Sequence, residues 1–436
     1  MTPILSTSRQ QTALQVLKLA QGGDPQYAGK TNSPALGNDL GALVDNNSQK
    51  NAMARISKLL LEGASASRGW MVVMPADAKM VEGGSGNDVV NLASAGDEDQ
   101  LNYISLGDGN DRLNLVSTGD ATSDYWQGQA VSVATAASDA VGAKTAVVVP
   151  EGQGIFAGAG NDIVNIAAGR DVYIVGGNDG QDVLNVAAGR NAFGIWGGSG
   201  NDVVSVAAGK NVDNITGDAG DDIVTVAAGV DARSISGGEG RDILTVAAGK
   251  RASEISGGQG SDIINIAAVQ AAYISGDDGD DAITIAANTV DHVDGGSGSD
   301  SIVINARTAS AISGGRGDDT IDLTGTDKAS VFFDRGDGKD LVRIKGETTI
   351  TFAGRSIDDA AISYGDGKIT ISFADNGDSV TVDYSVAALK GHAPELSSGK
   401  GGESGFFTPG SNTNDLPLFK TYFESHSAAG FSLTLR

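Results

Sequence analysis

The chain has 436 residues with 63 glycines, no cysteines, 5% aromatic residues, a formal net charge of −25 and a pI of about 4.3. This much glycine beside an ordinary 40% of hydrophobic residues predicts a turn-rich β architecture and argues against a helical enzyme. The acidic balance excludes nucleic acid as a natural partner and favours cations or basic surfaces, while the lack of cysteine excludes disulfides and thiolate metal sites.

Residues 1–80 are predicted to form a partly helical N-terminal cap. Residues 10–21 and 48–61 carry apolar side chains at helical spacing, among them Leu14, Leu17 and Ile56. We expect them to cover the open end of the repeats that follow. The opening MTPILSTSRQQTAL lacks the basic and apolar regions of a cleavable signal peptide, and no apolar run approaches the ~18 residues of a membrane helix. Export would therefore need another signal.

Residues 81–346 repeat a glycine-rich motif that ends in aspartate. The aspartates lie 19–21 residues apart, except for two early spacings of 23 and 51. A fixed period near twenty is the signature of a solenoid in which each repeat forms one coil. The longest gap marks residues 119–154 as an insertion or a degenerate coil. The aligned residues are Asp88, Asp111, Asp162, Asp182, Asp202, Asp222, Asp242, Asp262, Asp281, Asp300, Asp319 and Asp340.

Aliphatic residues recur within each coil at fixed distances from the aspartate. They fall two and four places after it, as in Val204 with Val206 and Leu244 with Val246. This alternation predicts a short strand with one face inward. A second inward position lies about thirteen places after the aspartate. Two short strands and two turns per coil predict a parallel β-helix or β-roll. The residues at the second position include Ile195, Ile215, Ile235, Ile255, Ile274 and Ile312.

The C-terminal quarter departs from this period. Residues 347–389 alternate in an antiparallel manner, and GDGK within ISYGDGKITISF predicts a hairpin turn. Residues 390–436 are rich in Gly, Ser, Pro and Asn and predict a flexible tail. The sequence thus predicts an all-β solenoid of about 20-residue coils, with a small helical N-terminal cap and an antiparallel β C-terminal cap.

The repeated aspartate predicts a cation site. Stacked coils bring equivalent residues to roughly 4.8 Å, where two carboxylates repel by about 1 kcal/mol even in water. A cation between coils removes that repulsion, and the glycines bring backbone carbonyls close to it. Carboxylate and carbonyl oxygens without His or Cys favour Ca²⁺ over Mg²⁺. The alternative is that GGxGxD simply makes a tight turn that the aspartate assists.

The stretches GGSGNDVVS, GGEGRDILT, GGQGSDIIN and GGRGDDTID resemble the glycine-aspartate nonapeptide of the RTX (repeats-in-toxin) family, GGxGxDxUx with U a large aliphatic. The resemblance covers roughly residues 83–345. It implies a β-roll that binds calcium between successive turns, type I secretion, and folding in millimolar external calcium. By the same resemblance, residues 347–389 are a closing segment and the tail is an uncleaved secretion signal, although it ends in Arg436 and not in an acidic residue with aliphatics.

The resemblance also implies the metal ligands. These are the aspartates named above together with the glycines of their turns: Gly197, Gly198, Gly200, Gly237, Gly238, Gly240, Gly257, Gly258 and Gly260.

One feature of the coil departs from the family. A standard β-roll has two nonapeptides per turn and two calcium rows, whereas each coil here has one GGxGxD and an opposite turn such as AAGRNA or AAGKNV. We therefore predict a single row of up to about eleven ions, whose charge of about +22 nearly neutralises the chain. The opposite edge carries a cationic column in four of six coils: Arg170, Arg190, Lys210, Val230, Lys250 and Gln270. It is either a solvated edge that discourages aggregation or a binding edge.

No motif for catalysis stands out, since HExxH, GxSxG and phosphate-loop patterns are lacking and His292, His392 and His426 are isolated. We expect a non-enzymatic, extracellular or cell-surface protein with a structural or adhesive role that folds on calcium binding. Its expected partners are calcium, with anionic surface polysaccharide or other copies of itself as open alternatives. A calcium-held surface-layer or filament subunit is the second hypothesis, and a polysaccharide-active enzyme is the third.

Overall fold

The structure is a computed structural model. It describes residues 80–82, 87, 89–94, 103–117, 154–385, 396–400, 403–406, 421–426 and 430–435. The predicted N-terminal cap up to residue 79, Asp88 and residues 119–153 lie outside the described residues. The chain divides into two compact units, with the boundary in the repeats between Ala232 and Arg233.

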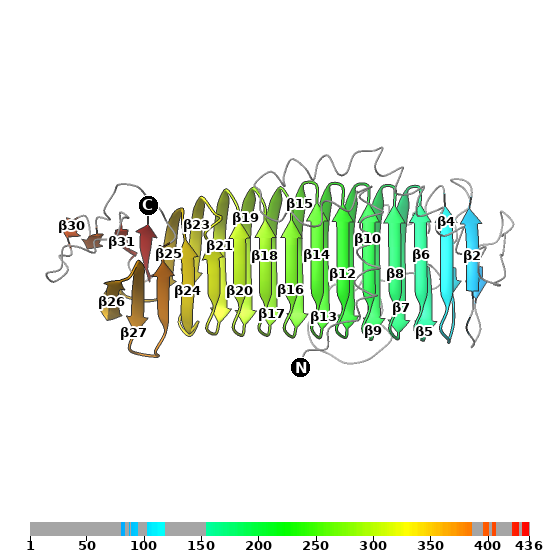
Figure 1. Ribbon diagram of the computed structural model, residues 1–436, viewed down its shortest axis with the longest axis horizontal. Helices are drawn as coiled ribbons and strands as arrows, with labels where there is room; N and C mark the ends of the chain where they lie inside the picture. Colours follow the sequence, from blue (N-terminus) through cyan, green and yellow to red (C-terminus); the bar gives the residue numbers. More distant parts are fainter. Residues whose placement is uncertain are drawn as a thin grey trace. The chain divides into compact units, whose positions relative to one another are not determined.

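The first unit is a parallel β-solenoid, as predicted from the repeat. Each coil contributes one strand to each of two sheets (Figure 1). The first sheet pairs β1 (Met80–Glu82), β3 (Tyr103–Ser105), β5 (Gly154–Ala159), β7 (Asp171–Asp179), β9 (Asn191–Ser199) and β11 (Asn211–Ala219). The second pairs β2 (Val89–Ser94), β4 (Arg112–Ser117), β6 (Ile163–Ala168), β8 (Val183–Ala188), β10 (Val203–Ala208) and β12 (Ile223–Ala228).

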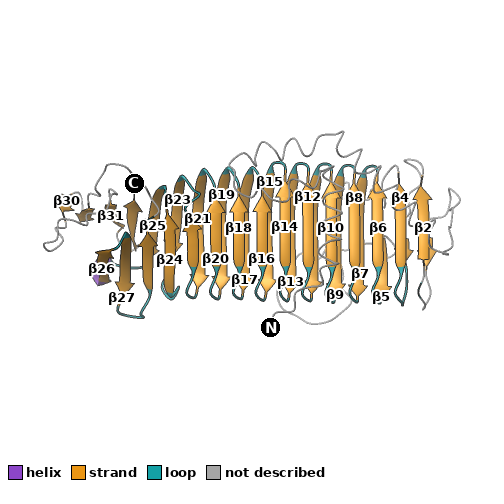
Figure 2. Ribbon diagram, in the orientation of Figure 1, coloured by secondary structure: helices purple, strands orange, loops and turns teal. Residues whose placement is uncertain are grey.

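The second unit, which follows β13 (Asp231–Glu239) in the chain, is built from coils of the same kind. One sheet pairs β15 (Arg251–Gln259), β17 (Gln270–Asp278), β19 (Thr289–Ser297), β21 (Thr308–Arg316), β23 (Lys328–Phe333) and β25 (Glu347–Ala353) in parallel. The other pairs β14 (Ile243–Ala248), β16 (Ile263–Ala267), β18 (Ala282–Ala286), β20 (Ser301–Asn305), β22 (Thr320–Leu323), β24 (Lys339–Ile344) and β28 (Ser379–Asp383). Figure 2 shows almost no helix in the described chain.

The aliphatic columns predicted from the repeat form the core. Val204 pairs with Val224 and Val206 with Val226, so equivalent residues stack in register. In β10, Val204 is 0% exposed and Val206 is 2% exposed. The second predicted column, from Ile195 to Ile312, is 0–1% exposed. Both predictions of inward residues are therefore confirmed, because strands stacked in register can bury the same face in every coil.

The long strand of each coil bends in a way that the sequence did not predict. Its bend is a residue with φ of 53–67°, the left-handed region, immediately before the second inward column. A third inward column lies three residues before that column and contains Val172, Val212 and Val290, at 0–2% exposure. Inward residues spaced by three break simple alternation, which is why alternation alone missed them. The bend residues are Ile174, Gly194, Asn214, Ser234, Glu254, Tyr273, His292 and Ala311.

The C-terminal closing segment is antiparallel, as predicted. After a short 3₁₀ helix, η2 (Ile357–Asp359), β26 (Ala360–Gly365) and β27 (Lys368–Phe373) form a hairpin, and β27 pairs antiparallel with β28. Within the tail that the sequence predicts to be flexible, the structure describes β29 (Leu396–Lys400), β30 (Glu403–Phe406), β31 (Thr421–His426) and β32 (Gly430–Leu435). The last of these, β32, pairs antiparallel with β25 and buries Phe431, Leu433 and Leu435 at 0–1% exposure. Alternation of these residues with Ser432 and Thr434 is a strand signal that the tail's composition concealed.

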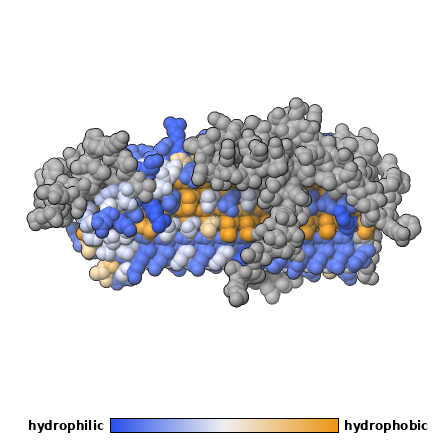
Figure 3. Space-filling model, viewed as in Figure 1, coloured by the Kyte–Doolittle hydropathy of each residue, from blue (hydrophilic) through white to orange (hydrophobic). Residues whose placement is uncertain are grey.

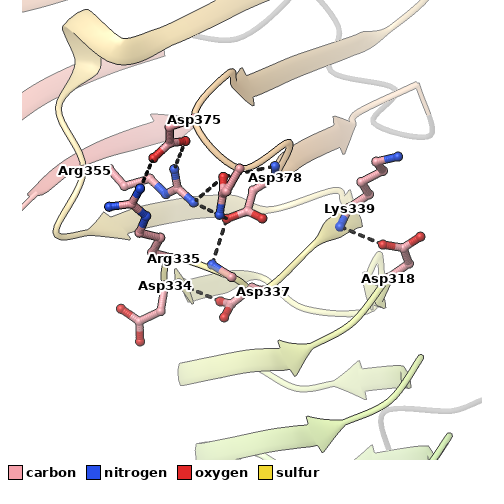
Figure 4. A network of polar contacts seen from close by, with 10 residues as sticks. Asp318, Asp334, Arg335, Asp337, Lys339, Arg355, Asp375 and Asp378 are labelled. Atoms are coloured by element: carbon pink, nitrogen blue, oxygen red, sulfur yellow. Dashed lines mark hydrogen bonds and ion pairs between the residues drawn. The ribbon is translucent and has the colours of Figure 1, made fainter.

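A buried arginine ties this closing segment to the last motif turn (Figure 4). Arg355 is 8% exposed, forms ion pairs with Asp375 and Asp378, and lies 4.1 Å from the ring centroid of Phe373. The Gly336 amide in turn donates a 2.8 Å hydrogen bond to Oδ2 of Asp378. The loop between β27 and β28 is therefore fixed to the turn that precedes β24.

The edge opposite the aspartates is held together by side chains and backbone bonds of its own. Asp171, which is fully buried, accepts hydrogen bonds from the guanidinium of Arg190 and from the backbone and side-chain amides of Asn191, one coil later. These contacts hold the pKa of Asp171 below its usual value although burial opposes them. Across the coils of this edge, the Lys210 amide donates to the Arg190 carbonyl at 2.6 Å. Arg190 of the predicted cationic column is thus a structural residue.

We expect Arg190→Gln to lower the free energy of unfolding by about 2 kcal/mol. The substitution leaves the buried carboxylate of Asp171 without its cation, and the loss falls below the usual ~3–5 kcal/mol because the Arg190 side chain is 40% exposed. Lys250→Gln, in the same column but exposed, is the matched control and should change stability by less than about 0.5 kcal/mol. Equal unfolding midpoints of the two variants in denaturant with calcium would contradict this assignment.

Candidate metal centre

The predicted aspartates lie together at one edge of the coil. Ten of the eleven described aspartates directly precede a strand, and Asp340 is the second residue of β24. Their exposed fractions are only 0–4%, far lower than expected for aspartates in surface turns. Within each unit, the described aspartates therefore lie along one edge of the coils, eleven of the twelve predicted residues in all, and Asp88 lies outside the described residues.

In nine of the described aspartates, one carboxylate oxygen accepts a hydrogen bond from the aspartate amide of the preceding coil. Oδ1 of Asp281 accepts a 2.7 Å hydrogen bond from the Asp262 amide, and Oδ1 of Asp300 accepts one of 2.8 Å from the Asp281 amide. The same bond joins Asp162 to Asp111 at 2.6 Å in the first unit. The alternative in which the aspartate completes a turn is thus correct for one of its two oxygens.

The other oxygen, Oδ2, is buried and accepts no hydrogen bond in six of these residues. An ionised oxygen in this condition is costly, because burial removes its water and nothing replaces it. In four of the six residues, Asp262, Asp281, Asp300 and Asp319, Oδ2 lies over the first glycine of its own turn. A Cβ on Gly257, for example, would overlap Oδ2 of Asp262 and would lie 2.6 Å from the carbonyl oxygen of Gly276, one coil later. The six residues are Asp162, Asp262, Asp281, Asp300, Asp319 and Asp340.

The pKa values of the same six carboxyls reflect this environment. Burial is the main cause that raises the pKa of Asp262 and Asp281 to about 7 and that of Asp340 to about 8. The charge of the aspartate in the preceding coil raises these values further, while its amide hydrogen bond lowers them. For Asp162, Asp300 and Asp319 the pKa rises to about 6 for the same reasons. Without a cation, the fold therefore favours protonation of this column.

The glycines named from the sequence all lie in these turns and have two distinct roles. The first of each turn, as in Gly197, Gly237 and Gly257, has no room for a Cβ beside Oδ2 of the aspartate. The second and third have φ of 112–123°, which residues with a side chain rarely adopt. These are Gly198, Gly200, Gly238, Gly240, Gly258 and Gly260. In these turns, the first glycine is required because Oδ2 of the aspartate lies close to its Cα, and the second and third are required because their φ values are positive.

A second ladder, which the sequence analysis missed, runs beside the first in the opposite direction. In seven coils, the residue before the aspartate uses a side-chain oxygen to accept a hydrogen bond from a backbone amide of the next coil. Oδ1 of Asp280 accepts from the Ser299 amide at 2.7 Å, and Oδ1 of Asn161 accepts from the Gln181 amide at 2.8 Å. Its sequence signal is the frequent Asn, Asp or Ser that precedes the aspartate. The two ladders together leave Oδ2 as the buried oxygen of the turn that still needs a positive partner.

The oxygens of this edge fit a hard cation. Among the residues that the structure describes, no group of three or more His, Cys, Asp or Glu side chains is placed to hold a metal. An ion at this edge would therefore combine few carboxylate oxygens with backbone carbonyls. Ca²⁺ accepts such mixed oxygen sets in flexible geometry, whereas Zn²⁺ prefers nitrogen and sulfur. The buried Oδ2 beside a glycine carbonyl satisfies this requirement.

A match to a known family model points the same way. The family model of the RTX calcium-binding nonapeptide repeat matches residues 155–173 and 196–232, in four copies. A search of solved structures found a hyperactive, Ca²⁺-dependent, β-helical antifreeze protein from an Antarctic bacterium, with 19% identity, a TM-score of 0.41, and coverage of 67% of this chain and 86% of that one. The search of curated proteins found no match. No helix in the described part of the chain is long and apolar enough to span a membrane.

We expect Gly257→Ala to lower the free energy of unfolding by about 1–3 kcal/mol, because its methyl group would displace Oδ2 of Asp262. Gly365→Ala is the control, since a Cβ there meets no atom within 4 Å and its φ is not positive. Chemical denaturation in saturating calcium gives the comparison. If the two substitutions cost the same, the close approach at the first glycine is not a constraint.

The aspartate column also predicts how the calcium-free chain responds to pH. The pKa of these carboxyls is higher in the folded chain than the ordinary 3.8, so their contribution to stability is complete below pH 3.8 and is lost as pH rises through about 6–8. With a chelator present, the unfolding temperature should be higher at pH 5 than at pH 8. Carboxyls with lowered pKa, such as Asp171, remain ionised across this window and do not reverse the trend. A calcium-free unfolding temperature that rises from pH 5 to pH 8 would contradict the prediction.

Proposed function

Because its coils carry RTX calcium-binding nonapeptide repeats, we propose that this chain is an exported structural or adhesive protein whose solenoid folds on calcium at or outside the bacterial cell surface. The observation that supports it most directly is the column of buried Oδ2 atoms that accept no hydrogen bond. Anything that binds the folded chain and not the unfolded chain stabilises it. A cation at these oxygens would therefore promote folding.

Each ion would be held between successive turns. The ligands on this chain would be Oδ2 of an aspartate and the carbonyl oxygen of the first glycine in the next turn, as with Asp262 and Gly276. The ion supplies the positive charge that offsets burial and like-charge repulsion in the column. The aspartates and turn glycines named above are accordingly the proposed ligands.

A single row of ions is supported by the opposite edge. There, the carboxylate of Asp171 is already neutralised by Arg190, and the side-chain amide of Asn211 donates to that of Asn191 at 3.2 Å. No calcium is needed to hold that edge in these coils. The contrast between the edges agrees with the presence of one motif per coil.

An extracellular location is supported by the calcium requirement and by the repeats, which are typical of secreted proteins. Sites of this kind bind weakly enough to be filled by millimolar calcium and emptied at cytosolic concentrations. RTX repeats are typically non-enzymatic, which supports a structural or adhesive role over catalysis. Lys210 and Lys250 remain exposed members of the cationic column and are candidates for contact with anionic polysaccharide or with another copy.

We expect the double variant Asp281→Asn/Asp300→Asn to require about tenfold more calcium to reach half-maximal β structure. Asparagine keeps the Oδ1 acceptor of the ladder but removes the negative charge and the Oδ2 ligand. Calcium titrations of purified protein followed by far-ultraviolet circular dichroism give the midpoints. Retention on the surface of producing cells should be lost over the same calcium range.

Asp366→Asn is the control for the substitution type, because it removes one carboxylate charge in the hairpin turn between β26 and β27, where φ is 52° and suits asparagine. Its calcium midpoint should match that of the parent chain. Equal β content with and without chelator would contradict the calcium-dependent fold. A protein that remains in the cytosol when the medium contains millimolar calcium would contradict the proposed location.

A further inference from the structure

The sheet of short strands in the second unit ends in a strand that pairs on one side only. In this sheet β24 is followed by β28, β27 and β26, so β26 is the last of the described strands. It pairs antiparallel with β27, and none of the described strands pairs with its other edge. Figure 1 shows β26 beside β27 at the end of this unit. The backbone groups along the open edge of β26 can therefore receive a further strand.

The hairpin turn fixes which residues of β26 face the open edge. Asp366 and Gly367 have φ of 52° and 72°, as in a two-residue type I′ turn. In such a hairpin, Gly365 and its partner in β27 exchange backbone hydrogen bonds, and bonded pairs then alternate with unbonded pairs along the strands. Ile362 and Tyr364 belong to the unbonded pairs. Their amides and carbonyls are consequently directed away from β27, toward the open edge.

Strand β26 lacks the features that usually protect an open edge. Its sequence, AAISYG, has no charged residue and no proline, and its pairing with β27 contains no bulge. Tyr364 is 36% exposed, and Ile362 is half-buried although Ile371, which it faces in β27, is fully buried. Figure 3 shows apolar side chains at the end of the molecule where Figure 1 places β26. The core is thus incompletely covered along this edge.

We propose that two copies of this chain join through their β26 strands, which pair antiparallel about a two-fold axis at Ile362. In this register Ile362 faces the partner's Ile362, and Tyr364 faces the partner's Ala360. The Ala360 amide already donates to the carbonyl of Ile357 within the chain, so the bonds across the axis come from the amides of Ile362 and Tyr364 in each copy. Core-facing side chains then meet core-facing side chains, and the two sheets become one continuous sheet.

The strand is its own complement in this register. A shift by one residue would place core-facing side chains opposite outward-facing ones. A shift that centres the axis on Tyr364 would bring the turn residue Asp366 into the pair. The register at Ile362 therefore uses the strand most fully. The contact involves neither the proposed calcium ligands nor the cationic column, so its test is separate from that of the calcium sites.

Charge and size set the strength of this contact. Asp358 of each copy lies opposite the partner's Asp366 at the two ends of the pair, where like charges oppose association and salt screens them. Six residues a side is fewer than the roughly 20–30 of a standard interface. We therefore expect a dissociation constant on the order of 10 µM, which decreases when salt is added.

Sedimentation velocity of the full chain in saturating calcium tests the pairing. The dimer fraction should rise as the protein concentration increases from about 1 µM to about 100 µM. Ile362→Pro should leave the monomer alone, because proline removes the amide at the axis while an edge strand whose N–H faces solvent tolerates it. Ile362→Val keeps the amide and a branched side chain, and this control should dimerise as the parent does. Both variants should retain the circular dichroism spectrum of the parent in calcium, which separates loss of pairing from loss of folding.

Disulfides test the register, because the chain has no cysteine of its own. Oxidation of Ile362→Cys should give a covalent dimer, since facing residues at the axis have Cα atoms about 5.5 Å apart. Ala361→Cys should cross-link to Ser363→Cys when the two variants are mixed, and about tenfold more slowly when either is oxidised alone, because each faces the other residue across the axis.

Three results would overturn the proposal. The first is a chain that stays monomeric at about 100 µM in calcium and added salt. The second is a dimer that persists in Ile362→Pro, which would place the contact on another surface. The third is cross-linking of Ala361→Cys alone as fast as in the mixture with Ser363→Cys, which would exclude the two-fold register at Ile362.

Discussion

Stacking of equivalent residues at the inter-strand distance is the constraint on which this structure depends. In a parallel solenoid, each side chain meets its counterpart in the next coil, as Val204 meets Val224. For an aliphatic residue this arrangement is favourable, because every coil extends the same buried column. For a carboxylate it is unfavourable, since each added coil adds a like charge beside the last. The chain nevertheless places an aspartate at the same position in every described coil.

The two edges of the coil resolve this problem differently. At the opposite edge, Asp171 is fully buried and Arg190 of the next coil supplies its counter-charge, so this pair is neutral without a metal ion. At the aspartate edge, Oδ1 of Asp281 accepts from the neighbouring amide and its Oδ2 has no donor, so neutrality there requires a proton or a cation. Burial raises the pKa of Asp340 to about 8, so this carboxyl binds a proton where no cation neutralises it. Calcium and protons are therefore alternative partners of one column.

Backbone strain accompanies this geometry in the long strands. Ile174 has a φ of 58°, a conformation that a β-branched residue adopts only when its surroundings determine it. The bend lets two inward columns on one strand be separated by three residues, which keeps both in the core. Gly194 is the one glycine among the bend residues, so its positive φ causes no clash between a side chain and the backbone. The in-register pairing of neighbouring coils, as between Val175 and Ile195, holds this conformation in place.

The repeat in the sequence by itself determined the solenoid, its period, its aliphatic columns and the edge on which the aspartates gather. These features are local or periodic, so alternation around Val204 and the spacing from Asp262 to Asp281 suffice to predict them. Only the tertiary structure decided which oxygen of each aspartate is available, because Oδ1 is used by an amide one coil away. It also decided that Arg190 neutralises Asp171, that Ile174 bends its strand, and that Phe431 enters the core from the tail. Each of these depends on contacts between residues far apart in the chain, and neither composition nor period encodes them.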